Sequence, residues 1–225
     1  MARERFEQEM RRLAERIQEL GALAEAAVLD SVTALRRQDL AKAQALVQAD
    51  RRINEMRFEL ENEALMLIAT QQPVAGDLRA LAAVLEIATE LERIADYAKG
   101  IATITLTIGT EPLLIPFADL TRMAELACGM LHRALEAYVR GDERAAGAIP
   151  NEDGKVDALY EKVYRELAAY LLANPKAIDQ AMRLTWAAHN LERVADRVGN
   201  ICERVVFWIT GSVEEMTDDS GPRRS

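Results

Sequence analysis

Apolar residues recur every three or four positions along most of the chain, which is the spacing of one face of an α-helix. Nowhere do apolar and polar residues alternate between glycines, as they would in a half-buried strand. The pattern therefore predicts an all-α fold. The first predicted helix covers about residues 3–37, and Gly21 within it marks a slight bend or a close neighbour. Its apolar stripe consists of Phe6, Met10, Leu13, Ile17, Leu20, Ala24, Ala27, Val28 and Leu35.

Turn-forming residues divide the pattern into six long helices. Pro73 disfavours helical geometry in the residue before it, and Asp39 is suited to cap the helix that follows. The clearest break covers residues 109–116, and an irregularity is expected near Pro150 and Gly154. The approximate ranges of the predicted helices are 3–37, 40–70, 74–108, 117–140, 143–172 and 177–209.

The second half of the chain repeats the first. The sequence LERIAD at residues 91–96 becomes LERVAD at residues 191–196, and Asn174-Pro175 corresponds to Gln72-Pro73. Self-similarity over such a distance predicts two tandem three-helix bundles, not a solenoid of short repeats. The predicted units are residues 1–109 and 117–211, followed by a polar, disordered tail at 212–225.

Composition excludes several classes of protein. A formal charge of −9 argues against a protein that binds nucleic acid by neutralising phosphates. Two cysteines, Cys128 and Cys202, lie in helical apolar patterns, where a buried free thiol is expected. No signal peptide is apparent and no apolar run reaches the roughly 20 residues of a membrane span. We therefore expect a cytoplasmic protein that does not insert into membranes.

The duplicated motif places two carboxylates one helical turn apart. In a helix, Glu92 and Asp96 lie on the same face, and so do Glu192 and Asp196 in the second copy. Each half therefore carries one acidic pair at the same position of its third helix.

A further polar pair stands on the second helix of each unit, at the same four-residue spacing. These pairs are Asp50 with Asn54, and Asp153 with Asp157. The two pairs of a unit lie at similar numbers of residues on either side of its hairpin turn. Because antiparallel helices rise equally per residue, each hairpin should bring its four groups to nearly the same level.

Clustered carboxylates repel one another and need cations nearby. Spacing alone favours an ordinary ion-pair network, and the candidate cations are Arg51, Arg52, Arg93, Lys99, Lys155 and Arg193. The alternative is a metal ion, since oxygen ligands suit Mg²⁺, Mn²⁺ or Ca²⁺ and can hold iron or zinc with bridging water. His189 shares a face with Glu192 and is a candidate additional ligand.

Catalytic signatures are missing from the sequence. It contains no Gly-x-Ser-x-Gly elbow, no Gly-x-x-x-x-Gly-Lys phosphate loop and no Gly-x-Gly-x-x-Gly turn. Trp186 and Trp208 follow the apolar pattern of the last helix and are expected in the core or at an interface. We therefore do not expect an enzyme.

The paired LERIAD and LERVAD motifs, the segment Gly76-Asp77-Leu78-Arg79 after Pro73 and two three-helix units together resemble the PhoU family of phosphate-transport regulators. The resemblance covers nearly the whole chain. It implies a cytoplasmic, non-enzymatic adaptor that links the ATPase subunit of the phosphate ABC transporter to a membrane sensor histidine kinase. Such an adaptor restrains phosphate uptake and represses phosphate-starvation genes when phosphate is plentiful.

The resemblance also implies iron or zinc clusters at the surface. The family's metal motifs map onto Glu92 with Asp96 and Glu192 with Asp196, and the helix-two pairs correspond to the polar pairs described above. Asn54 stands where the second half has Asp157, and an amide is a weaker ligand for a hard cation than a carboxylate, so the first site should bind metal more weakly.

Three hypotheses follow. The first is a regulatory adaptor with two acidic surfaces, which we expect to form a homodimer because its helices are long and have exposed edges. The second is a metal-dependent hydrolase or oxidase with a carboxylate-bridged multinuclear centre. The third is a purely structural helical bundle.

Overall fold

The computed structural model of the protein describes residues 2–114 and 118–212, and the described chain is helical with no strand. This confirms the all-α prediction. The predicted helix start at Phe117 and the predicted tail beyond Ser212 lie outside the described residues. The elements are α1 (Ala2–Arg37), α2 (Leu40–Gln71), α3 (Gly76–Ile108), α4 (Ala118–Arg140), α5 (Glu143–Ala148), η1 (Ile149–Glu152), α6 (Asp153–Ala173), η2 (Pro175–Ala177) and α7 (Ile178–Thr210).

The helix boundaries follow the local chemistry of the sequence. Asp39 caps α2, since its Oδ1 accepts a hydrogen bond from the backbone N–H of Lys42 at 2.9 Å. Asp142 caps α5 in the same way. The expected irregularity at Pro150 is the single 3₁₀ turn η1, which separates α5 from α6. Gly154, in contrast, lies within regular α6.

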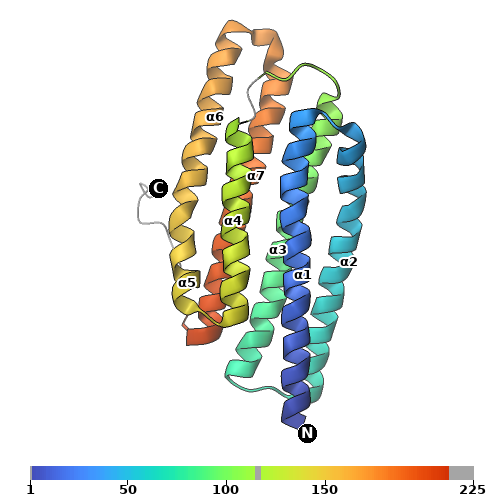
Figure 1. Ribbon diagram of the computed structural model, residues 1–225, viewed down its shortest axis with the longest axis vertical. Coiled ribbons are helices and arrows are strands. Elements are labelled where there is room, and N and C mark those ends of the chain that lie inside the picture. Colours follow the sequence, from blue (N-terminus) through green and yellow to red (C-terminus); the bar gives the residue numbers. More distant parts are fainter. Residues whose placement is uncertain (1, 115–117, 213–225) are drawn as a thin grey trace.

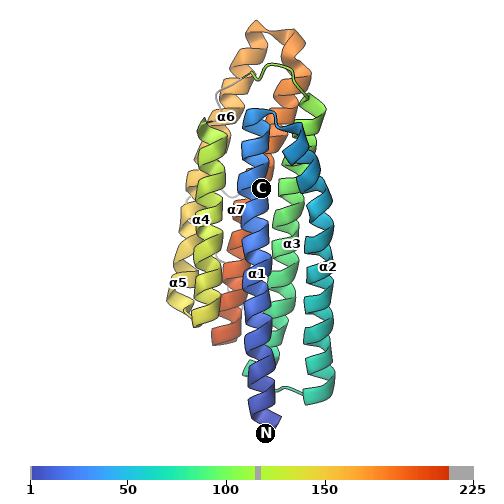
Figure 2. The ribbon, with the colours of Figure 1, turned by 45° about the vertical axis from the view of Figure 1, so that its right-hand side comes forward.

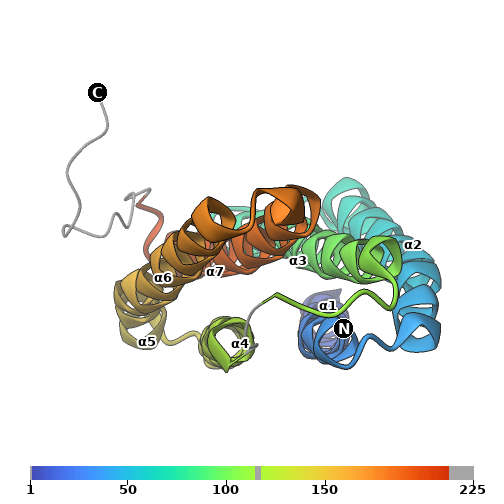
Figure 3. The ribbon, with the colours of Figure 1, turned by 90° about the horizontal axis from the view of Figure 1, so that it is seen from above.

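The long helices form two layers. One layer contains α2, α3, α7 and α6, with the antiparallel pair α3 and α7 at its centre, and the other contains α1 and α4 (Figure 3). Viewed from above, α1 and α4 lie side by side against one face of the α3–α7 pair, while α2 flanks α3 and α6 flanks α7 (Figure 3). The long helices run up and down along the same axis (Figures 1 and 2). None of the helices in the described residues combines the length and apolar character of a membrane span.

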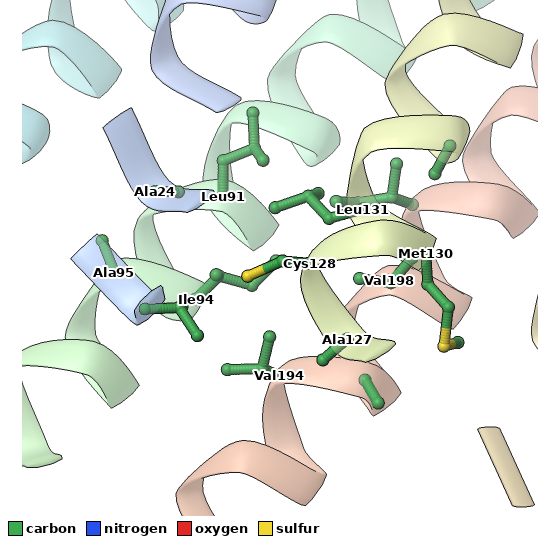
Figure 4. Close-up of a cluster of buried hydrophobic side chains, with 14 of the residues drawn as sticks. Ala24, Leu91, Ile94, Ala95, Ala127, Cys128, Met130, Leu131, Val194 and Val198 are labelled. Carbon is green, nitrogen blue, oxygen red and sulfur yellow. The ribbon is translucent and has the colours of Figure 1, made fainter. Parts of the chain in front are cut away.

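One hydrophobic core joins the two predicted units. It includes Leu20 of α1, Leu91 of α3, Leu131 of α4 and Leu191 of α7, all fully buried. Figure 4 shows part of it, with side chains of α3 and α4 meeting those of α7. Each unit therefore buries apolar surface against the other.

Both cysteines are free and buried, as expected from the sequence. Burial raises the pKa of the Cys128 thiol to about 12 and that of the Cys202 thiol to about 12. Both thiols therefore stay protonated at neutral pH and pack as small apolar groups.

At Gly21, α1 comes close to the Leu135 side chain of α4. A Cβ atom at this position would overlap Cδ1 of Leu135. The glycine thus lets Leu135 pack against the α1 backbone, which confirms the close neighbour expected at Gly21.

Candidate functional site

The contact between α3 and α7, here called the seam, aligns the two copies of the motif. Across it, Arg204 Nε lies 2.7 Å from Glu86 Oε2, Asn200 Nδ2 donates to Glu90 Oε2 at 3.2 Å, and Arg193 Nε donates to the Tyr97 hydroxyl at 3.5 Å. Each step towards the C-terminus on α3 is matched by an equal step towards the N-terminus on α7. The two motifs therefore lie at the same level, related by an approximate twofold axis.

The first acidic cluster consists of Asp50, Asn54, Glu92 and Asp96. Lys99 Nζ lies 2.7 Å from Asp50 Oδ2 and 3.3 Å from Asp96 Oδ1, so it bridges α2 and α3. Asn54 Nδ2 donates to Asp50 Oδ2 at 3.0 Å. This arrangement confirms that the first hairpin brings its polar pairs to one level.

The charges of the first cluster act on one another. Burial raises the pKa of Glu92 above its usual value, and the negative charges of Asp96 and Asp50 raise it further. The hydrogen bond to Asp50 raises the pKa of Lys99, which keeps this side chain positively charged. Lys99 thus offsets the repulsion between Asp50 and Asp96. The charges of Arg57 and Arg93 lower the pKa of Glu92.

The second acidic cluster consists of Asp153, Asp157, Glu192 and Asp196. Burial raises the pKa of Glu192, as do the charges of Asp196 and Asp157, so the second hairpin also brings α6 and α7 carboxylates together. Burial raises the pKa of Asp196 as well. Asp153 opens α6 one turn before Asp157 and is half-buried.

His189 and Arg193 lie beside the carboxylates of the second cluster. His189 Nδ1 lies 3.1 Å from Glu192 Oε2, and Arg193 Nη1 lies 3.4 Å from Asp196 Oδ2. His189 therefore faces the cluster, as its spacing from Glu192 predicted.

Two of the six candidate cations, Lys99 and Arg193, form ion pairs with cluster carboxylates. The other four, Arg51, Arg52, Arg93 and Lys155, pair with glutamates outside them. The ion-pair network predicted from the sequence is therefore confirmed for Lys99 and Arg193.

The two clusters differ in charge although the motif is shared. Lys99 of the first copy corresponds to Gly199 of the second, and Asn54 corresponds to Asp157. The second cluster therefore has one more carboxylate and one fewer ammonium group than the first. An all-carboxylate donor set with a histidine beside it is the better match to a cation.

Metal binding by the eight cluster residues stays a prediction. Among the described residues, no three histidine, cysteine, aspartate or glutamate side chains converge as a set that could hold a metal ion.

Sequence comparison of the motifs did not single out Glu90, one residue before the first copy. This residue is only 8% exposed, and its carboxylate accepts hydrogen bonds from Arg93, Arg197 and Asn200. A sequence signal for Glu90 did exist: the second repeat has Asn190 at the equivalent position. A duplicated helix keeps its core residues but can change the residues that contact the other helix across the seam.

We expect Glu192→Gln to raise the melting temperature of the metal-free protein at neutral pH. Burial and the charge of Asp196 raise the pKa of Glu192, so the folded state binds this proton more tightly than the unfolded chain does. The stabilisation contributed by this group is therefore complete below the unfolded-state pKa and is lost as the pH rises through the folded-state pKa. Glutamine carries no charge, so the variant does not lose this stabilisation as the pH rises.

Thermal melts from about pH 4 to about pH 8 check this expectation, because the window brackets the ordinary glutamate pKa. The exposed Glu15→Gln serves as the control. A stabilisation as large in acid as at neutral pH would contradict the electrostatic cause.

Comparison with known proteins gives consistent matches along the chain. The model of the PhoU domain matches it twice, at residues 17–105 and 120–205. A phosphate-specific transport system accessory protein PhoU homolog from Caulobacter vibrioides is 36% identical over 213 residues, which cover 94% of this chain and 92% of that protein.

Solved structures agree. The crystal structure of PhoU from Pseudomonas aeruginosa superposes with a TM-score of 0.87 at 30% identity, covering 92% of this chain and 100% of that one. The phosphate transport system regulatory protein PhoU from Streptococcus pneumoniae gives a TM-score of 0.86 at 27% identity, covering 93% and 99%. The family resemblance drawn from the two motifs is thereby confirmed.

Proposed function

Because this chain belongs to the PhoU family, we propose that it is an accessory protein that regulates a phosphate-specific transport system. The proposal rests on the similarity along nearly the whole chain to proteins that carry this name. The observation that supports a mechanism is the pair of acidic clusters at one level of a rigid helical body.

The proposed mechanism is docking, with the chain as an adaptor between two partners. The partners are the ATPase subunit of the phosphate ABC transporter and the sensor histidine kinase of the phosphate response. At about 1.5 Å per residue, α3 and α7 are each roughly 50 Å long, and a helix pair of this length forms a stiff platform for both. When phosphate is plentiful, simultaneous docking would restrain uptake and repress the phosphate-starvation response.

The difference between the clusters supports two distinct partners. The first acidic cluster is partly neutralised by Lys99, whereas the second has Gly199 at that position and retains more negative charge. Surfaces of different charge favour different complementary partners.

An iron or zinc ion would bind at the second acidic cluster more readily than at the first. Its donors would be drawn from Asp153, Asp157, Glu192 and Asp196, with His189 beside them, and these side chains would have to turn towards one another, since no three of them converge among the described residues. In the first acidic cluster, the Lys99 ammonium already pairs with the carboxylates that a metal would need. The ion would supply positive charge for a partner's carboxylates or phosphates.

The joint replacement of Glu92, Asp96, Glu192 and Asp196 by alanine tests the adaptor role. We expect capture of the purified ATPase subunit and of the kinase's cytoplasmic part to weaken by roughly 10-fold or more, as for interfaces that lose central charge pairs. Circular dichroism should show an unchanged helix content, because Glu92, Glu192 and Asp196 are only half-buried and Asp96 is exposed. Iron and zinc content is measured on the same samples and should fall.

The matched control removes four exposed glutamates outside the clusters, Glu15, Glu125, Glu143 and Glu161. It lowers the net negative charge equally. Equal loss of capture in both variants would show that only net charge matters, and unchanged capture by the cluster variant would refute the docking surfaces. Metal-dependent phosphatase or oxidase activity in the wild type would favour the enzymatic alternative.

A further inference from the structure

A solvent-filled groove of about 600 Å³ lies along the seam next to the first acidic cluster. Asp96 and Lys99 stand at one end of it. We call it the Trp186 groove, because Trp186 is its largest side chain. A groove of this size accepts several side chains of a partner.

The α7 wall of the Trp186 groove continues an exposed apolar ridge. Ile178, Met182 and Trp186 follow one another at one helical turn, and they are 54%, 51% and 61% exposed. Trp208, in contrast, packs against Tyr138 with ring centroids 5.5 Å apart. Trp186 is therefore not a core residue, which leaves the interface as the role expected for it from the sequence.

The duplicated half provides an internal comparison for the groove. At the equivalent place across the twofold axis, Glu86 stands for Trp186, and Ala82 stands for Met182. There, Arg204 Nε reaches across the seam and lies 2.7 Å from Glu86 Oε2. The same helix pair can thus carry an ion pair at this place, so the fold does not require an apolar ridge there.

The charges beside the ridge are also unmatched. Within residues 2–114 and 118–212, neither Asp179 nor Arg183 forms an ion pair or side-chain hydrogen bond, although both line the groove. They lie one turn apart on α7. A partner segment with a carboxylate and a basic group at the same spacing would pair with both.

Met216, the last aliphatic or aromatic residue of the chain's own tail, cannot reach the ridge. Met216 is five residues beyond Gly211, a reach of at most roughly 18 Å in an extended chain. Trp186 is 25 residues before Gly211, about 37 Å away along helix α7.

We propose that the Trp186 groove docks an amphipathic helix of a partner protein. The helix would lay its apolar ridge on Met182 and Trp186, and it would present an acidic side chain to Arg183 and a basic one to Asp179. A helix lying in the groove of two others is a common recognition mode for such a surface. This inference rests on the proposed function, since it takes the transporter's ATPase subunit as the partner.

The test measures the affinity of the purified ATPase subunit for the full-length protein by calorimetry. Trp186→Ala and Arg183→Glu should each weaken binding by roughly 10-fold or more, because aromatic and arginine side chains at the centre of an interface carry most of the affinity. Tyr164→Ala is the control, since Tyr164 is 51% exposed on α6 and lies outside the groove. All variants should keep the wild-type melting temperature.

The outcomes separate this inference from the proposed function. Wild-type affinity in Trp186→Ala, together with loss in the four-carboxylate variant, would overturn the groove and leave the adaptor role intact. No binding of the ATPase subunit by the wild type would overturn the groove inference, and binding of neither partner would overturn both. Light scattering on the protein alone measures its oligomeric state. If the wild type were a dimer and Trp186→Ala a monomer, a second copy of this chain would fill the groove and the proposed partner helix would be overturned.

Discussion

Replacing Gly21 with valine should destabilise the protein by about 1–3 kcal/mol, the usual effect of overpacking a close helix contact. The added side chain would overlap Cδ1 of Leu135, which would have to leave its packed position in the core that both units share. Urea unfolding followed by circular dichroism measures the change. Gly129→Val on α4 is the matched control, because no atom lies within 4 Å of its Cβ position.

A second substitution identifies the cause of the Gly21→Val effect. Leu135→Ala alone should cost about 2–5 kcal/mol, but it also makes room for the valine. The double variant should therefore lose less stability than the two single losses added together. Strict additivity would show that the contact between Gly21 and Leu135 is not responsible.

Replacing Lys99 with methionine should lower the free energy of unfolding by about 2–3 kcal/mol. This loss is smaller than the loss expected when one partner of a fully buried ion pair is removed, because water reaches the lysine. The Lys99 side chain is 39% exposed, but that of Asp50 is only 7% exposed and would lose its ion-pair partner. Urea unfolding at neutral pH measures the loss.

Neutralising both partners of this pair provides the control. Asp50→Asn with Lys99→Met leaves no isolated charge, and it should regain most of the lost stability. If the double variant were as unstable as Lys99→Met alone, lost packing of the lysine stem would be the cause instead of the buried charge.

Much of this architecture follows from local chemistry. Apolar periodicity, the cap at Asp39 and the turn before Pro73 place the helix ends within about two residues of those in the structure. Because antiparallel helices rise equally per residue, the sequence also predicted that Asp50 on α2 and Asp96 on α3 would lie at nearly the same level along the first hairpin. These features depend only on neighbours along the chain or on one hairpin.

Contacts between the units could not be predicted in the same way. Periodicity shows that a helix has an apolar face, but not which other helix covers it. The pairing of α1 with α4 depends on the fit of Gly21 to Leu135, and the seam depends on pairs such as Glu86 with Arg204. The apolar pattern likewise could not show that Trp186 faces water, since buried and exposed ridges have the same spacing.

The position of α3 at the centre of the molecule has a consequence for synthesis on the ribosome. Its packing partner α7 is translated about a hundred residues later, at roughly 5–20 residues per second. The side of α3 that faces α7 therefore stays uncovered for roughly 5–20 s in each nascent chain. During that interval the first half exposes an apolar surface that chaperones can bind, and the native topology is completed only when the last long helix leaves the exit tunnel.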